Sequence, residues 1–317
     1  MQSLITVLAP LSFFLLIGIV MRRRAILSQQ QMSGVTAIIM QVCLPAVLLL
    51  TFLEMDLQLR YIWLSVATIV LLTLFLLVGA LVEQVWRGRS LLLPFYASGF
   101  AFGLLGIPLV TLVFGQDELA VYTVLGVGHE LFVWFVYYPL LSRRLGTHDR
   151  NGPGLPARLL RSPIVVAITL GISANALGLG PWLIGGGGAW LGTTLELLAG
   201  ATTPLILIAV GYNLRIDRQV LATGLGMVVM RLAITFSVGY LIKVTVLGPL
   251  LGFDGAVFTH MFFALIVLPG LYSLPVFVAR HEDRKLEQEA SSVVTLGTAV
   301  SMVLFVLYVL AMNVDLA

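Results

Sequence analysis

The sequence predicts an all-α membrane protein with ten transmembrane helices, arranged as two inverted five-helix repeats in which helices 4 and 9 are broken and cross. Three observations predict this fold class. Only 10% of the 317 residues are charged and 59% are hydrophobic, whereas soluble domains carry about 25% charged residues. Apolar runs long enough to span a bilayer recur along the whole chain. Basic residues gather in alternate loops between these runs.

Ten apolar runs of roughly 20 residues mark the expected membrane spans. They cover residues 4–21, 33–52, 61–82, 91–114, 119–142, 163–180, 189–211, 221–242, 255–279 and 291–312. The first run is not expected to be a cleaved signal peptide, because three arginines follow it and no basic residue precedes it. The connections are short, so no separate soluble domain is expected. We therefore divide the chain into a first repeat at 1–142, a cytoplasmic linker at 143–162 and a second repeat at 163–317.

The basic residues predict the orientation of the spans in the cell (inner) membrane. Alternate loops hold nearly all of the 18 lysines and arginines: Arg22, Arg23, Arg24, Arg87, Arg89, Arg143, Arg144, Arg150, Arg158, Arg161, Arg215, Arg218, Arg280, Arg284 and Lys285. The opposite loops hold only Arg60. Since basic loops stay in the cytoplasm, both termini are expected outside. These arginines also explain the isoelectric point of about 9.2, so nucleic-acid binding is not expected.

Prolines indicate an internal repeat. Pro45 of span 2 corresponds to Pro204 of span 7, and Pro108 of span 4 corresponds to Pro269 of span 9, at nearly the same separation. A repeat of five spans enters the membrane from the opposite side the second time, because five is odd. Inverted repeats of this kind are typical of secondary transporters.

Spans 4 and 9 are expected to be interrupted near mid-membrane. Span 4 contains several glycines before Pro108, and span 9 contains Pro269-Gly270 followed by Pro275. Proline removes a helical hydrogen bond and glycine weakens a helix. The free N–H groups and positive helix ends beginning near Pro108 and Pro269 would suit a carboxylate or another small anion. The carbonyl groups that end the preceding half-helices would suit a cation.

The expected substrate site lies at this crossing. Its candidate residues come from the two interruptions and from the neighbouring span 5: Ala101, Phe102, Gly103, Gly106, Pro108, His129, Pro269, Gly270, Tyr272 and Ser273. A single cysteine, Cys43, excludes a disulfide framework and a multi-cysteine metal site. We expect no metal, no cofactor and no catalytic residue.

The same segments resemble a known family. GFAFGLLGIPLVTLVFG in span 4, TTPLILIAVGYNL in span 7, VLPGLYSLPVFVARHED in span 9, TLGTAVS in span 10 and CLPAVLLLTF in span 2 resemble motifs of the auxin efflux carrier family. The resemblance implies the ten-span fold shared with bile acid sodium symporters. It implies a scaffold of spans 1, 2, 6 and 7 and a moving transport domain of spans 3–5 and 8–10. It also implies elevator-like alternating access and a homodimer built on the scaffold.

The chain departs from this family at one position. Ala101 stands where family members commonly carry an asparagine whose amide contacts the substrate carboxylate, and Phe102 makes the crossing more apolar. The acidic and glutamine sodium ligands of bile acid symporters have no counterpart between Phe258 and Ala279. Sodium coupling is therefore disfavoured.

Three ionisable residues lie near the middle of the predicted spans, where charge is costly and usually functional. His129 and Glu130 lie in span 5 and Arg231 lies in span 8. We expect a structural or gating ion pair between Glu130 and Arg231. Because histidine changes charge near neutral pH, proton coupling through His129 or Glu130 competes with this structural role. A helical stripe through Glu130 continues to Tyr137.

The leading interpretation is a secondary transporter that moves a small organic anion across the lipid bilayer. The alternatives are a sodium-coupled bile acid-type symporter and a membrane sensor without transport. An intramembrane enzyme is disfavoured, because no nucleophile motif or metal-ligand cluster accompanies His129 and Glu130.

Overall fold

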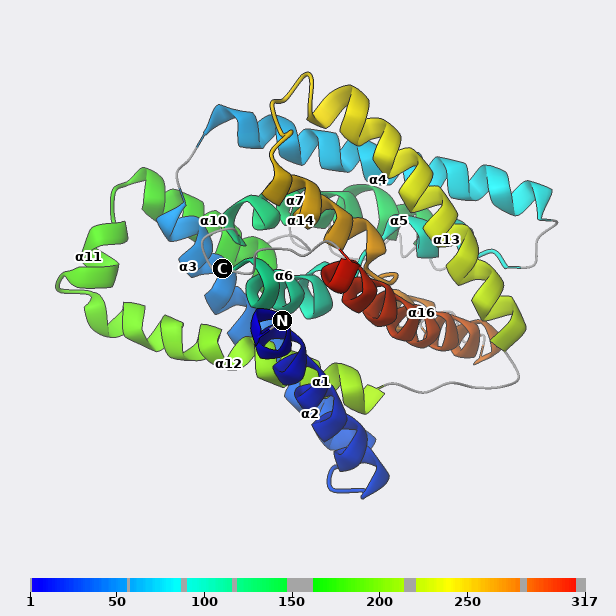
Figure 1. The fold of residues 1–317 in the computed structure, drawn as a ribbon, viewed down its shortest axis with the longest axis horizontal. Coiled ribbons are helices and arrows are strands. Elements are labelled where there is room, and N and C mark those ends of the chain that lie inside the picture. Colours follow the sequence, from blue (N-terminus) through cyan, green and yellow to red (C-terminus); the bar gives the residue numbers. More distant parts are fainter. Residues whose placement is uncertain are drawn as a thin grey trace.

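The protein is a helical membrane protein (Figure 1). The computed structural model describes residues 2–55, 58–86, 90–115, 119–146, 162–213, 221–279 and 284–311, and no strand occurs among them. Six helices are long and apolar enough to cross a membrane: residues 29–54, 59–85, 119–144, 189–213, 223–247 and 285–311. Shorter apolar helices cover 102–114, 163–176 and 256–267. Together with α1 (Gln2–Arg23), helices occupy all ten predicted runs.

Part of the orientation prediction lies outside the described residues. This applies to most of the linker, to the ends of the chain, and to Arg87, Arg89, Arg150, Arg158, Arg161, Arg215, Arg218 and Arg280.

The first helix group contains α1, α2 (Gln29–Ile38), α3 (Leu44–Glu54), α10 (Pro163–Ala176), α11 (Gly180–Gly185) and α12 (Ala189–Asn213). Within it, α1 packs along α12, and α3 packs along α10 and α12. Glycines allow α1 and α12 to approach closely. A Cβ atom on Gly18 would lie 2.1 Å from the Ile208 carbonyl oxygen, and one on Gly211 would lie 2.2 Å from that of Leu15.

The second helix group contains α4 (Leu59–Val85), α5 (Leu93–Ser98), α6 (Ile107–Phe114), α7 (Leu119–Phe132), α8 (Tyr138–Arg144), α13 (Leu221–Ile242), α14 (Ala256–Val267), α15 (Leu274–Ala279) and α16 (Arg284–Ala311). Helix α4 packs on α5, α7 and α13, while α16 packs on α13, α14 and α15. Arg144 of α8 pairs with Glu83 of α4 at 2.5 Å. The two groups meet where α3 and α12 contact α6, α7 and the turn before α6.

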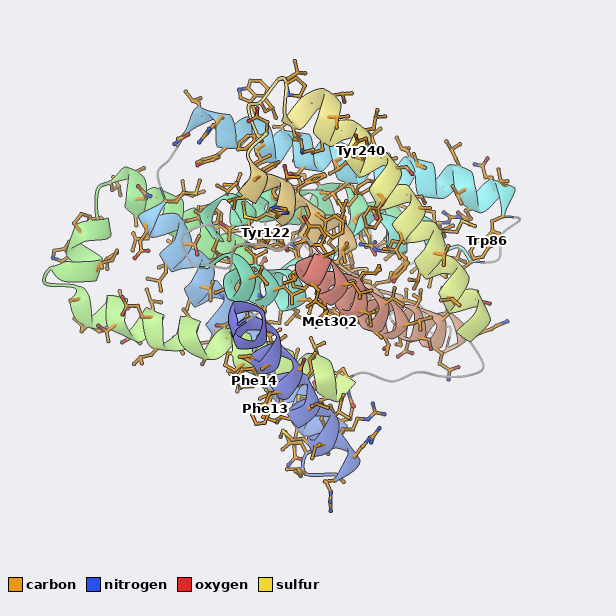
Figure 2. The ribbon with its side chains drawn as sticks, viewed as in Figure 1. Phe13, Phe14, Trp86, Tyr122, Tyr240 and Met302 are labelled. Carbon is orange, nitrogen blue, oxygen red and sulfur yellow. The ribbon has the colours of Figure 1, made fainter. Side chains whose placement is uncertain are left out.

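Large apolar side chains cover much of the outer surface, as a lipid environment requires. Figure 2 shows Tyr122 in the middle of the molecule and Tyr240 at its edge. Tyr122 is completely buried, whereas Tyr240 is 68% exposed. Exposed leucine, isoleucine, valine and tryptophan side chains also line α4, α12 and α13. The long apolar helices therefore present apolar faces outward as well as inward.

Three prolines lie inside continuous helices, each just after a π-helical turn. Pro45, Pro108 and Pro139 are each the second residue of an α-helix that follows a π-helical turn. These turns are η1 (Ile39–Cys43), η2 (Phe102–Gly106) and η3 (Val133–Tyr137). Proline lacks an N–H group and its ring crowds the carbonyl of the preceding turn, which the wider π-turn accommodates.

The two expected interruptions are present, but one lies at a different residue from the one predicted. In span 4 the helix stops at Ser98, runs extended through Gly99 and resumes at Phe102, so the expectation that the second half begins near Pro108 is wrong. In span 9 the interruption includes Pro269, as predicted, because α14 ends at Val267. The second half begins at Leu274, so the expectation that it begins near Pro269 is wrong as well. Pro275 is the second residue of α15, at the start of this half-helix.

Candidate functional site

The two interruptions contact one another directly. The backbone N–H of Ala101 donates to the carbonyl oxygen of Pro269 at 3.0 Å. One bond of this kind satisfies two backbone groups that no helix satisfies. Segments far apart in the chain are thereby joined at one crossing inside the second helix group.

Arg231 binds the carbonyl ends of both half-helices at this crossing. Its Nε and Nη2 atoms donate to the backbone carbonyl oxygen of Leu268 at 3.2 and 2.9 Å. Nη2 also donates to the backbone carbonyl oxygen of Pro269 at 3.3 Å. Nη1 donates to the backbone carbonyl oxygen of Tyr96, near the end of α5. The side chain is 1% exposed and lies over the Tyr96 and Phe100 rings, at 5.2 and 4.8 Å. A cation suits this place because helix C-termini carry unpaired carbonyls and partial negative charge.

The prediction of an ion pair between Glu130 and Arg231 is therefore wrong. Glu130 instead has His129 as its ionic neighbour, with 3.7 Å between Oε1 and Nδ1. Backbone carbonyls fill the hydrogen-bonding sites of Arg231 that a carboxylate would have occupied.

His129 attaches α7 to the interruption of span 4. The backbone N–H of Phe100 donates to Nε2 of His129 at 3.1 Å. Because Nε2 accepts a hydrogen, the neutral imidazole that makes this bond carries its own hydrogen on Nδ1. The histidine is 1% exposed, stacks with Phe102 at 5.9 Å, and has no hydrogen-bond partner at Nδ1. A buried donor thus faces the space beside Glu130.

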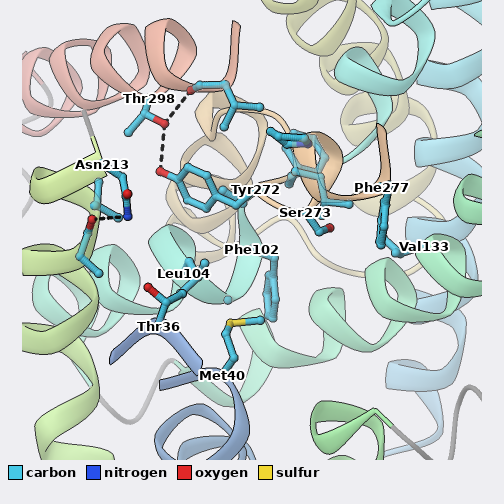
Figure 3. Close-up of a pocket in the computed structure, with 18 of the residues that line it drawn as sticks. Thr36, Met40, Phe102, Leu104, Val133, Asn213, Tyr272, Ser273, Phe277 and Thr298 are labelled. Carbon is cyan, nitrogen blue, oxygen red and sulfur yellow. Dashed lines mark hydrogen bonds between the residues drawn. The ribbon is translucent and has the colours of Figure 1, made fainter. Parts of the chain in front are cut away.

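An open cavity of about 1820 Å³ lies between the two helix groups (Figure 3). The crossing contributes residues 100–104 and 271–273 to its wall, and α16 contributes polar residues between Glu287 and Thr298. The first group contributes residues of α2, η1 and α12, including Met40 and Asn213. Figure 3 shows Met40 and Phe102, from different groups, pointing toward each other.

The cavity wall extends to the ends of helices that adjoin the basic loops. Its wall includes Gln29 at the start of α2, Ser142 in α8, Ser162 before α10, Asn213 at the end of α12 and Glu287 near the start of α16. Each of these positions neighbours a loop that is rich in arginine in the sequence. The crossing forms part of the wall away from these ends.

Seven of the predicted site residues line the cavity: Ala101, Phe102, Gly103, His129, Glu130, Tyr272 and Ser273. Gly106, Pro108, Pro269, Gly270 and Arg231 do not line it. The two glycines serve packing against tyrosines. A Cβ atom on Gly106 would lie 1.9 Å from the Tyr122 hydroxyl, and one on Gly270 would lie 2.3 Å from the Tyr96 ring.

Polar side chains of α16 reach the crossing through Tyr272. The hydroxyls of Tyr272 and Thr298 lie 2.9 Å apart, and Thr298 donates to the Val294 carbonyl at 2.8 Å (Figure 3). Thr298 thus bonds both its own helix and Tyr272 of the crossing.

Trp134 and Tyr138 line the cavity but were missed in the sequence. Counting 3.6 residues per turn places Tyr137 on the face of Glu130, yet Tyr137 is completely buried and Tyr138 reaches the cavity. The π-turn η3 adds a residue to that turn and shifts the later side chains around the helix. Pro139 is the one sequence signal that marks this shift, because π-turns precede prolines at three places in the fold.

No group of three histidine, cysteine or acidic side chains able to hold a metal ion occurs within the part of the chain that the structure describes. The cavity thus offers hydrogen-bond donors, two carboxylates and aromatic rings. No protein-family model and no curated protein gives a significant match to this chain.

Proposed function

We propose that the protein is a secondary transporter that moves a small organic anion of the carboxylate type by elevator-like alternating access. The observation that carries this proposal is the cavity between two helix groups, with two crossed, interrupted helices in its wall. In membrane proteins, interrupted backbone is tolerated where it is buried in protein or faces a wet cavity. Transporters place substrate sites at such interruptions.

The packing of the helices supports a division into a scaffold and a moving domain. The first helix group corresponds to spans 1, 2, 6 and 7, and the second corresponds to spans 3–5 and 8–10. Both interruptions, and Arg231 that joins them, belong to the second group. The crossing would therefore move as one unit against α3 and α12.

Hydrogen-bond donors at the crossing support a carboxylate ligand. The η2–α6 helix begins at Phe102, so the N–H groups of Phe102, Gly103 and Leu104 have no acceptor within their helix. All three residues line the cavity, and the unpaired Nδ1 of His129 lies nearby. These donors and the positive helix end take the place of the side-chain amide that Ala101 lacks.

The proposal includes ten spans in two inverted repeats, with both termini outside and a homodimer formed by the scaffold. In this orientation the cavity opens to the cytoplasm, because its wall extends to helix ends that adjoin the basic loops. Proton coupling through one of the two residues, His129 or Glu130, is part of the proposal, since both line the cavity. Protonation of His129 at Nε2 would release the Phe100 N–H.

Transport is tested with purified protein in proteoliposomes. A thermal-shift screen of mono- and dicarboxylates, including succinate and indole-3-acetate, would identify a stabilising anion by mass action. Uptake and counterflow of that labelled anion would then be measured. A sensor or receptor would bind an anion without counterflow, and dependence on a sodium gradient would favour the symporter alternative.

Movement of the two groups is tested with a disulfide in a Cys43→Ser background. A Cβ atom on Gly103 would lie 3.1 Å from Cδ1 of Leu44, across the boundary between the groups. A Gly103→Cys, Leu44→Cys pair should therefore stop counterflow when oxidised and restore it on reduction. The control is Gly224→Cys with Leu296→Cys, whose corresponding distance is 3.5 Å within the second group. Unimpaired counterflow by the oxidised Gly103–Leu44 pair would contradict elevator movement at this boundary.

A further inference from the structure

One wall of the cavity combines a carboxylate with aromatic rings. Glu130, Trp134 and Tyr138 lie four residues apart along α7, η3 and α8, and all three line the cavity. The rings of Trp134 and Tyr138 are 6.0 Å apart, and Phe277 of α15 lies edge-on to Tyr138 at 5.0 Å. Aromatic faces beside a carboxylate attract organic cations.

The charges around Glu130 favour a positive group at this wall. Its side chain is 15% exposed, and among the described residues its one ionic neighbour is His129. That histidine is neutral while it accepts the Phe100 N–H. Among the described side chains that line the cavity, Glu130 and Glu287 carry formal charge, and none is lysine or arginine.

Unpartnered buried donors lie next to this wall. Nδ1 of His129 has no hydrogen-bond partner, although the histidine is buried and lines the cavity. His129 stacks on Phe102, the first residue of the η2–α6 helix. Donors for a carboxylate and an acceptor for an ammonium group thus lie side by side, with 3.7 Å between Nδ1 and Oε1 of Glu130.

We infer that the ligand is an α-amino acid with an apolar side chain, whose ammonium group binds Glu130 against Trp134 and Tyr138. The spacing points to this class because the two charged groups of an α-amino acid share one carbon atom. Apolar side chains of the same cavity, Met40 and Phe277, suit the ligand's side chain. This inference rests on the proposed carboxylate carrier and refines its substrate class, because the ligand keeps the carboxylate but is a zwitterion and has no net negative charge.

The test uses matched compounds that differ only in the ammonium or carboxylate group. Thermal-shift titrations of the full-length protein would compare L-leucine with 4-methylpentanoate and 3-methylbutylamine, and L-phenylalanine with 3-phenylpropanoate and 2-phenylethylamine. The amino acid should bind at least about tenfold more tightly than its matched acid, as a charged hydrogen bond implies.

Variants locate the contribution of the ammonium group. Glu130→Gln should weaken binding of the amino acid about tenfold or more. The matched acid should bind equally well or better, because the Glu130 carboxylate no longer repels it. Trp134→Phe should weaken binding of the amino acid a few-fold, since phenylalanine is a weaker cation–π partner than tryptophan. The controls Glu196→Gln and Trp190→Phe lie on α12 outside the cavity wall and should change neither affinity.

The possible results separate this inference from the proposed function. An acid that binds as tightly as its amino acid overturns the ammonium site and leaves the carboxylate carrier standing. An amine that binds as tightly as its amino acid overturns the carboxylate carrier. Binding by none of the compounds overturns the amino-acid inference, while anions found in the wider screen still test transport. The wild-type comparison and Trp134→Phe decide the matter even where Glu130→Gln does not fold.

Discussion

Replacing Arg231 by methionine should destabilise the crossing in the second helix group. The substitution removes the donors for three buried carbonyls, those of Tyr96, Leu268 and Pro269. The Tyr96 and Leu268 carbonyls are left without a donor, at a cost of about 1–3 kcal/mol each, whereas the Pro269 carbonyl keeps the Ala101 N–H. The lost attraction to the Tyr96 and Phe100 rings adds about 2 kcal/mol or more. Removing a buried charge recovers several kcal/mol of desolvation. We therefore expect a net loss of about 3 kcal/mol.

The assay is thermal unfolding of the detergent-purified protein, followed by size-exclusion fluorescence. A loss of about 3 kcal/mol corresponds to a fall of roughly 6 °C in the unfolding temperature. Arg231→Lys should lie between the methionine variant and the parent, because one compact ammonium group cannot reach both half-helices as the guanidinium does. Hydrogen exchange should also accelerate at the Ala101 N–H, whose acceptor is Pro269.

Arg60→Met is the matched control. Arg60 is exposed and lies over the Tyr61 and Phe253 rings at 5.4 and 5.5 Å, so its loss removes about 0.5–1 kcal/mol of cation–π attraction. A methionine variant of Arg231 that unfolds within about 1 °C of the parent, with unchanged exchange at Ala101, would refute the proposed role of Arg231 at the crossing.

Three further predictions concern the crossing and its neighbours. Gly270→Ala should lower the unfolding temperature and impair transport, because its Cβ would meet the Tyr96 ring at 2.3 Å; an unchanged melting curve would contradict this packing. His129→Gln keeps an acceptor for the Phe100 N–H but cannot titrate, so counterflow should continue and lose its pH dependence, whereas His129→Leu should lose counterflow. An unaltered pH profile in the glutamine variant would exclude proton coupling at this histidine. Ala101→Asn should bind carboxylates more tightly in the thermal-shift assay, since it adds an amide donor to the cavity wall; weaker binding would place the carboxylate elsewhere.

The helical architecture was predictable because hydrophobic runs report membrane spans directly. Every apolar run of the expected length coincides with helix, and the interruption at Pro269 lies where glycine and proline indicate it. His129 and Glu130 could likewise be chosen as site residues, since an ionisable side chain inside an apolar run needs a polar reason to be there. Both residues line the cavity between the helix groups.

Only the tertiary structure decided the partners and the register of the site. Arg231 binds backbone carbonyls, which every residue carries, so no side chain in the sequence marks its partners. The π-turn η2 places Pro108 inside a helix, and the π-turn η3 brings Tyr138 instead of Tyr137 to the cavity. Periodicity could not predict this shift, because it assumes a constant 3.6 residues per turn. Local composition therefore determined which segments are helical and which residues are chemically exceptional. Contacts with other segments of the chain, such as those of Arg231 with Tyr96 and Leu268 and of His129 with Phe100, determined the partners of these residues.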